Sequence, residues 1–121
     1  MRGMIAMTVA LLGIASPLAA QSIPFTLTPS PRNHPACTSG NNTFHNKKWS
    51  VAEARTTATV SGATAVTLRK GADGVFGGTA KVGNSMMVFS FVNNGRERVL
   101  KVTSNELGCV WQGTNLDPRR A

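Results

Sequence analysis

The chain has 121 residues, a formal net charge of +8 at pH 7 and only two cysteines. This length accommodates a single domain, and a hydrophobic fraction of 41% argues against a wholly disordered chain. Two cysteines are too few for a disulfide-dense miniature scaffold or for a zinc site with four cysteine ligands.

The first twenty residues predict a secretory signal peptide. Arg2 precedes a mostly apolar stretch over residues 4–14, and the segment ends on two alanines. This order is typical of a signal peptide, and the stretch is shorter than the about 20 residues that a transmembrane helix needs. We therefore expect residues 1–20 to be cleaved on export to the periplasm or the cell exterior, with no transmembrane segment later in the chain. Cleavage leaves 121 − 20 = 101 residues with 12 basic and 5 acidic side chains, a net charge of +7.

The mature chain is expected to start with an arm and to end with a tail. Residues 21–36 contain four of the six prolines, and proline has no backbone donor for a strand ladder. We therefore expect residues 21–36 to form an extended arm that cannot pair as an interior strand. A β-domain over residues 37–113 follows, with a polar loop at 38–48, and residues 114–121 are expected to be a flexible tail.

Alternating apolar and polar residues predict β-strands near residues 66–69, 75–82, 86–93, 96–102 and 109–111. The best-defined element is the hairpin around Asn94-Gly95, because these two residues tolerate the positive φ angles of a two-residue type I′ turn. That turn pairs Phe89 with Leu100 and Phe91 with Arg98. The core face of the hairpin then comprises Met87, Phe89, Phe91, Leu100 and Val102.

Residues 50–60 are compatible with two structures. Ser50 and Glu53 have the spacing of a helix capping box, whereas the Thr and Val residues that follow favour a strand. We expect a short helical turn or strand from Trp49, followed by strand to Val60, with a full helix as the alternative. The fold class predicted overall is all-β, a small antiparallel meander of about six strands that closes into a barrel or a sandwich.

The two cysteines predict one disulfide. An exported protein folds in an oxidising compartment, which favours a bond between Cys37 and Cys109. This bond would close a loop of 109 − 37 + 1 = 73 residues and tie the segment before the first predicted strand to the last one.

The sequence predicts neither a metal site nor a cofactor site. His34, Cys37 and His45 lie within twelve residues of one another, but their spacing fits no strong ligand motif and Cys37 has a partner in Cys109. Met86 and Met87 are adjacent on a strand and therefore point to opposite faces.

Enzymatic activity is not predicted either. The chain has no Gly-x-Ser-x-Gly motif and no phosphate-binding glycine loop. Its five carboxylates after residue 20 show no spacing that argues for an acid–base pair, and the disulfide removes both thiols.

The basic charge is the remaining indication of a partner. The predicted binding residues are Lys47, Lys48, Trp49, Arg69, Lys70, Arg96, Arg98 and Trp111. Trp49 and Trp111 are either core residues, as is usual for Trp, or exposed anchors at a barrel mouth. Nucleic acid is not an expected partner, because few aromatic residues alternate with the basic ones.

The sequence is therefore compatible with two functions. The first is an exported, non-catalytic binding module for an anionic glycan, a lipid headgroup or an acidic protein, because a net charge of +7 on a small body attracts polyanions. The alternative is an inhibitor of a secreted hydrolase that inserts the 38–48 loop or the N-terminal arm into the cleft of the enzyme.

Overall fold

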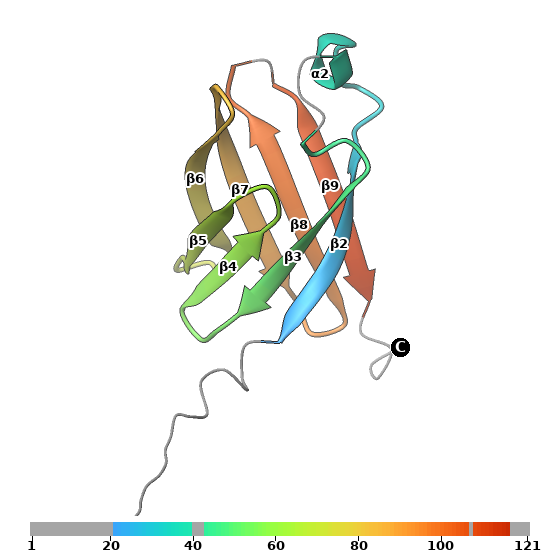
Figure 1. The fold of residues 1–121 in the computed structure, drawn as a ribbon. Coiled ribbons are helices and arrows are strands. Elements are labelled where there is room, and N and C mark those ends of the chain that lie inside the picture. Colours follow the sequence, from blue (N-terminus) through green and yellow to red (C-terminus); the bar gives the residue numbers. More distant parts are fainter. Residues whose placement is uncertain (1–20, 40–42, 107, 117–121) are drawn as a thin grey trace, which may run out of the picture.

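The protein forms a closed barrel of antiparallel strands, as Figure 1 shows for the computed structural model. The structure describes residues 21–39, 43–106 and 108–116, so the predicted signal peptide and residues 117–121 lie outside it. Each strand pairs with the next one along the chain, and the last pairs with the first. The predicted all-β meander with barrel closure is confirmed.

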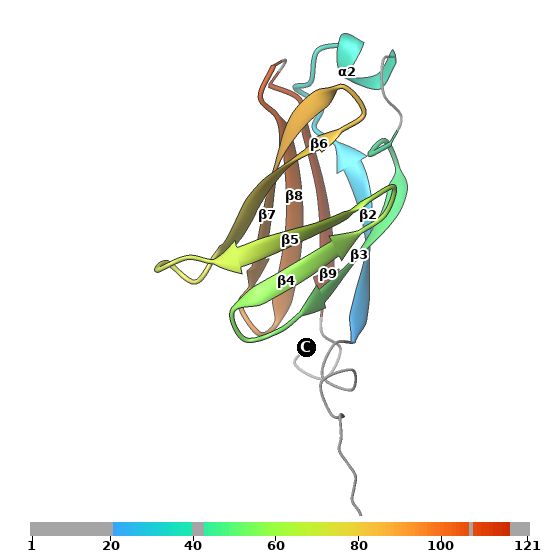
Figure 2. The same cartoon turned by 60° about the vertical axis from the view of Figure 1, so that its left-hand side comes forward.

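The described residues contain eight strands and one four-residue helix. In chain order they are β2 (Ser22–Pro29), α2 (Ala36–Ser39), β3 (Lys47–Glu53), β4 (Thr57–Ser61), β5 (Ala65–Lys70), β6 (Phe76–Val82), β7 (Ser85–Asn93), β8 (Glu97–Ser104) and β9 (Val110–Leu116). We call the end that carries α2 the upper end, as it lies in Figure 1. The lower end carries the β3–β4, β5–β6 and β7–β8 connections, of which the β5–β6 connection projects sideways in Figure 2.

The expectation that residues 21–36 form an extended arm that cannot pair as an interior strand is wrong for residues 22–29. They form β2, which pairs with β3 along Ser22–Leu27 and with β9 at Thr28 and Pro29. The carbonyl of Pro24 points toward β9, where it accepts a hydrogen bond from Asn115 Nδ2 at 3.0 Å. The nitrogen of a strand residue points to the same side as its carbonyl, so the missing donor of Pro24 does not face the β3 ladder. The predicted tail is also too long, because β9 continues to Leu116.

Of the structures expected for residues 49–60, the strand is confirmed, whereas the helical turn near residue 50 and the full helix are wrong. Residues 47–53 and 57–61 form the separate antiparallel strands β3 and β4, with Val51 paired to Val60. Trp49, Val51, Ala58 and Val60 are all buried, so strand alternation outweighs the capping-box spacing. The one strand expected to end at Val60 is thus two strands, and together with β2 this raises the strand number from the six expected to eight.

The β7–β8 hairpin has the predicted core face but a different register. Phe91 pairs with Leu100, and Asn93 with Arg98. The Asn94 N–H donates to the Glu97 carbonyl, which makes Gly95 the first central residue of the turn, with φ at +92°. Positive φ at that position is where a type II′ turn uses glycine. The register moves by two residues, and a shift of two keeps every side chain on its predicted face.

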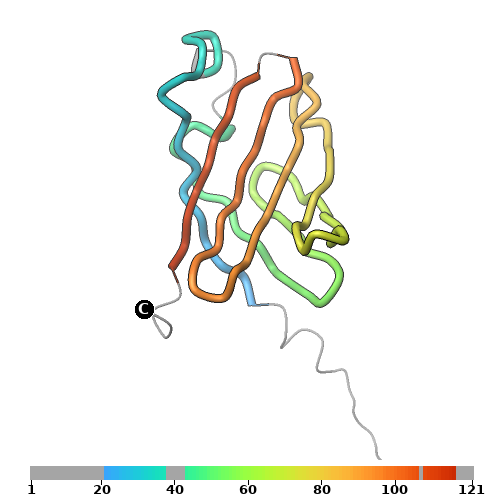
Figure 3. The backbone as a smooth tube through the Cα atoms, turned by 180° about the vertical axis from the view of Figure 1, so that it is seen from behind, coloured from blue at the N-terminus to red at the C-terminus, as the bar shows by residue number. Residues whose placement is uncertain are grey.

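Aromatic side chains fill the barrel interior. Phe25, Phe44, Phe76, Phe89, Phe91, Trp49 and Trp111 are all at most 2% exposed. Phe44 enters the upper mouth from the segment between α2 and β3, and its ring lies 5.0 Å from Trp49 and 5.2 Å from Trp111, between centroids. Seen from behind in Figure 3, β7, β8 and β9 run side by side as one wall of this core.

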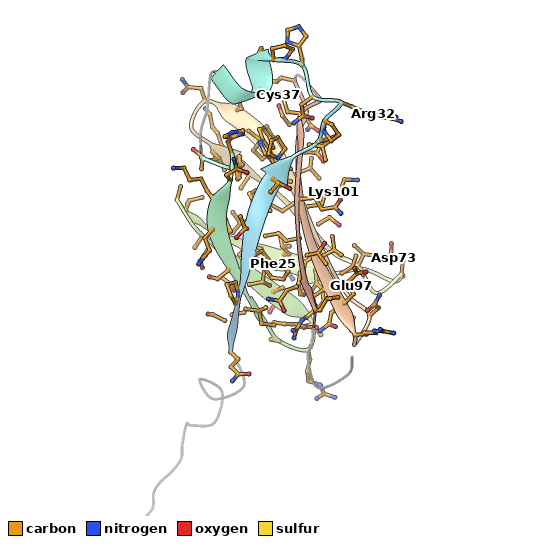
Figure 4. The ribbon with its side chains drawn as sticks, turned by 90° about the vertical axis from the view of Figure 1, so that its right-hand side faces the viewer. Phe25, Arg32, Cys37, Asp73, Glu97 and Lys101 are labelled. Atoms are coloured by element: carbon orange, nitrogen blue, oxygen red, sulfur yellow. A yellow bond between two sulfur atoms is a disulfide. The ribbon has the colours of Figure 1, made fainter. Side chains whose placement is uncertain are left out.

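The predicted disulfide joins Cys37 of α2 to Cys109, the residue before β9, with a Cα–Cα distance of 5.8 Å. It fixes α2 against the upper end of the barrel, where Figure 4 labels Cys37.

Two glycines allow close approaches within this framework. A Cβ at Gly62, in the β4–β5 connection, would overlap the six-membered ring of the Trp49 indole. A Cβ at Gly113 of β9 would lie 2.7 Å from the Thr26 carbonyl oxygen. Barrel closure at the β2–β9 seam therefore depends on a residue without a side chain.

Candidate functional site

The structure separates the predicted basic residues into two groups at opposite ends of the barrel. Lys47 and Lys48 begin β3 at the upper end, whereas Arg69 and Lys70 end β5 at the lower end. The lower end also holds Arg96 in the β7–β8 connection and Arg98 near the start of β8. The even spread along the sequence thus becomes a grouping of four of the six predicted cations.

Trp49 and Trp111 do not belong to either group. Each is 2% exposed and packs in the aromatic interior. The indole Nε1 of Trp49 donates to the Thr43 carbonyl at 3.1 Å. Of the two roles weighed for these residues, burial supports the structural one.

Arg55 joins the lower group although it is not among the predicted binding residues. It lies in the short connection between β3 and β4, with an exposed side chain. Recognising residues 47–61 as a hairpin would have placed Arg55 at this end. We call Arg55, Arg69, Lys70, Arg96 and Arg98 the lower cationic group.

The carboxylates at this end do not neutralise the lower cationic group by direct pairing. Glu53 ends β3, Asp73 lies in the β5–β6 connection and Glu97 begins β8, the last two being labelled in Figure 4. Among the described residues, no ion pair joins these carboxylates to a Lys or Arg side chain. Glu53 instead accepts a hydrogen bond from Asn93 Nδ2 at 2.6 Å. This bond crosses the lower mouth between the non-adjacent strands β3 and β7.

Arg98 has the most defined geometry of the five cations. It shares a strand face with the buried residues Leu100 and Val102, so its side chain starts toward the lower mouth. Its Nη2 donates to Asn115 Oδ1 at 2.8 Å, and Asn115 in turn donates to the Pro24 carbonyl. The Nε of Arg98 is buried and has no acceptor among the residues that the structure describes. One hydrogen bond to the Asn115 side chain therefore orients Arg98 and leaves its charge without a carboxylate partner among the described residues.

Lys70 is the second cation on an inward face, because it continues the alternation of the buried residues Val66 and Leu68. Its Nζ lies 5.5 Å from the centroid of the Phe76 ring. This cation–π contact stabilises the charge without neutralising it. An arginine-rich rim whose cations form no ion pair among the described residues is chemically suited to binding oxyanions, since guanidinium groups match the geometry of carboxylate, sulfate and phosphate.

The structure gives no cluster that suggests metal chemistry within its described ranges. Residues 21–39, 43–106 and 108–116 contain no group of three or more His, Cys, Asp or Glu side chains able to hold a metal ion. Within the same ranges, no helix has the length and apolar character needed to span a membrane.

Comparisons with models of known protein families, with curated proteins and with solved structures find no match to this chain.

Proposed function

We propose that the protein is an exported, non-catalytic binding module that holds an anionic envelope or extracellular component at its lower end. The observation that supports this is the lower cationic group: four arginines and one lysine from β5, β8 and two connections share one barrel end, and none of them forms an ion pair with a carboxylate among the described residues. Export rests on the predicted signal peptide, and the Cys37–Cys109 disulfide is compatible with an oxidising compartment.

The packed interior directs any partner to the outside of the barrel. A barrel of eight strands is wide enough either to be filled by side chains or to hold one small ligand. Here two Trp and five Phe side chains occupy the interior. A partner of the lower end therefore contacts the rim and the connections between strands.

Net charge alone does not distinguish the two ends. The upper end has a net charge of +3, from Arg32, Lys47, Lys48 and Lys81 together with the carboxylate of Glu106. The lower end has a net charge of +2, from the five residues of the lower cationic group together with three carboxylates. The difference lies in the type of cation. The lower end is mostly arginine and orients Arg98 through Asn115, whereas the upper end is mostly lysine.

The test compares two triple variants that remove the same charge. Arg69→Gln/Lys70→Gln/Arg96→Gln removes three cations from the lower end, and Lys47→Gln/Lys48→Gln/Lys81→Gln removes three from the upper end. Binding to heparin and to phosphatidylglycerol vesicles is measured at increasing NaCl concentration. We expect the lower-end variant to bind about tenfold more weakly than the upper-end variant, because three exposed ionic contacts are lost. Equal losses of affinity in the two triple variants would show that the interaction depends only on net charge, which would contradict the proposal.

A point variant tests the role of Arg98 without removing a cation. Asn115→Asp places a carboxylate where Arg98 Nη2 now donates to an amide oxygen. The resulting ion pair should reduce affinity for the same polyanions by several-fold. Asn84→Asp adds the same single negative charge in the exposed β6–β7 turn at the upper end and serves as the control. Unchanged affinity of Asn115→Asp would exclude Arg98 from the site.

The second candidate is an inhibitor of a secreted hydrolase that inserts the 38–48 loop into the cleft of the enzyme. The N-terminal arm is not free to enter an enzyme, since β2 is part of the barrel. The loop is anchored by the buried Phe44 and by the Trp49–Thr43 hydrogen bond, and such anchoring preorganises an inserted segment. Assays against secreted acidic proteases and glycosidases test it, with His45→Ala/Asn46→Ala expected to relieve inhibition. Absence of inhibition at micromolar concentration would eliminate this candidate.

A further inference from the structure

The outer wall of the barrel carries a groove over the β2–β9 seam, apart from the lower cationic group. Its volume is about 460 Å³, within the range of small-molecule sites. Its lining comes from β2 and the two residues that follow it, from Lys101 of β8 and from β9. Among the described residues that line it, none is acidic or aromatic, and Lys101 is the single cation. We call it the seam groove.

Strand pairing brings the polar side chains of the seam groove together. Lys101 pairs with Gln112, and Gln112 pairs with Thr28, so the three form one row across β8, β9 and β2 on the outer face. Residues that face each other on neighbouring strands have Cβ atoms about 5 Å apart. Thr26 and Thr114 are the next outward residues of β2 and β9 on the same side of this row. Polar side chains from three strands therefore line one short stretch of the seam.

The upper wall of the seam groove is fixed by hydrogen bonds. The Ser30 N–H donates to the Val110 carbonyl at 2.9 Å. The Asn33 side chain donates to the same carbonyl and accepts the Val110 N–H, with both distances 2.9 Å. These bonds hold the segment with Pro29 and Pro31 against the start of β9, where Pro29, Pro31 and Val110 form an apolar edge of the groove. An edge that is already ordered reduces the entropy lost when a ligand binds.

The polar groups of the seam groove are available to a ligand. Lys101, Gln112, Thr26 and Thr114 are exposed, and their side chains form no hydrogen bond or ion pair among the described residues. Figure 4 shows Lys101 projecting outward from the barrel wall. Thr28 differs, because its Oγ1 donates to the Gln112 carbonyl at 3.2 Å. One ammonium group, one amide and two hydroxyls thus line the groove with their hydrogen-bonding capacity unused.

We propose that the seam groove binds a sugar acid, a polyhydroxylated ligand that carries one carboxylate. The ammonium of Lys101 matches the carboxylate, and the amide of Gln112 and the two threonine hydroxyls match sugar hydroxyls as donors and acceptors. The C–H groups of the sugar ring pack against the apolar edge. A lining without aromatic side chains offers no stacking surface to an aromatic ligand. The seam groove is a second site, independent of the lower cationic group.

Binding is tested with cellobiouronic acid, a disaccharide of glucuronic acid and glucose, and with cellobiose, which has the same size but no carboxylate. Isotope-labelled protein is titrated with each sugar and followed by amide chemical shifts. We expect saturation by the acid at a dissociation constant of about 1 mM, and cellobiose binding about threefold to fivefold weaker. The shifts should map to Thr28, Lys101 and Gln112. Absence of saturation, equal affinities for the two sugars or shifts confined to other surfaces would overturn the proposal.

Two pairs of matched variants locate the site. Lys101→Gln should lower the affinity for the acid to that for cellobiose, whereas Lys81→Gln removes an exposed cation from β6 and should bind as wild type. Thr114→Trp fills the groove from an exposed position and should lower both affinities at least about tenfold. Thr67→Trp adds the same side chain at an exposed position of β5 and should leave both unchanged. Equal affinities within either pair would contradict the assignment.

The lower-end triple variant separates this site from the proposed function. Arg69→Gln/Lys70→Gln/Arg96→Gln should bind cellobiouronic acid as wild type does, even though its affinity for heparin and vesicles is expected to fall. Thr114→Trp should show the opposite pattern, with sugar binding lost and polyanion binding retained. Loss of cellobiouronic acid binding in the triple variant would assign the sugar acid to the lower cationic group and contradict the proposal.

Discussion

The two ends of the barrel are closed by different interactions. At the upper end, a disulfide, a four-residue helix and the buried Phe44 cover an aromatic interior. At the lower end, side-chain hydrogen bonds cross or rim the mouth, as between Glu53 and Asn93 and between Arg98 and Asn115. One end is therefore stabilised by covalent and apolar contacts, and the other by polar contacts that leave cations accessible.

The largest expected effect is on the upper end. Replacing both cysteines by Cys37→Ser/Cys109→Ser should lower the free energy of unfolding by about 4 kcal/mol, because the disulfide closes a long loop in the unfolded chain. Urea denaturation measures this loss, and wild type under reducing conditions serves as the control. Amide hydrogen exchange should accelerate near α2 and β9 before it does at the β7–β8 turn. Uniform acceleration would contradict a division into two separately stabilised ends.

A smaller effect is expected from filling the space beside Trp49. Gly62→Ala forces a Cβ into the indole ring, and overpacking of this kind costs about 1–3 kcal/mol. Gly77→Ala is the matched control, since the nearest atom to its Cβ is 3.9 Å away. Thermal melts of the two variants should differ clearly in Tm. A Gly62→Ala variant as stable as Gly77→Ala would mean that the Trp49 ring can move aside at little cost in free energy and that the upper end is loosely packed.

At the lower end, Asn115→Ala removes hydrogen bonds to both Arg98 and Pro24. Two such bonds contribute about 1–2 kcal/mol to the free energy of unfolding. Thr114→Ala, on the opposite face of the same strand and exposed, should change stability by less than about 0.5 kcal/mol. Chemical denaturation of both variants measures the difference. Equal stabilities would show that the polar contacts of the lower mouth orient Arg98 without stabilising the barrel.

The smallest effect distinguishes the two tryptophans of the upper end. Trp49→Phe and Trp111→Phe each remove a similar volume from the interior, but only Trp49 loses a hydrogen bond. We therefore expect Trp49→Phe to be less stable than Trp111→Phe by about 1 kcal/mol. Urea denaturation followed by circular dichroism measures both. The reverse order would indicate that the Trp111 donor has a partner in solution.

The fold could be predicted from the sequence where the information is local. Strand alternation identifies the inward face of the β7–β8 hairpin, and Met87, Phe89 and Leu100 are all buried as expected. The turn type was harder to predict from the sequence, because Asn94-Gly95 suits a type I′ turn and Gly95-Arg96 suits a type II′ turn. Side-chain bonds decide between them, since Asn94 Oδ1 accepts the Glu97 N–H at 2.7 Å. The core prediction survives because the two registers differ by an even number of residues.

The candidate site was less predictable than the fold. Arg69 and Arg96 are 27 positions apart in the sequence, and only the alternating strand directions bring them to one end. Lys47 and Lys48 look equivalent to them in sequence but begin a strand at the opposite end. Asn115 falls in the predicted tail, so its role beside Arg98 could not be seen before β9 was known to continue to Leu116.

The sequence by itself determined the all-β class, the inward side chains of the central hairpin and the pairing of the two cysteines. These follow from a two-residue alternation and from a count of cysteines, which need no knowledge of distant contacts. The tertiary structure alone decided that a proline-containing segment closes the barrel, that both tryptophans are buried and that the cations divide between two ends. Each of these depends on the β2–β9 pairing or on strand direction around a closed sheet, and no local pattern encodes either.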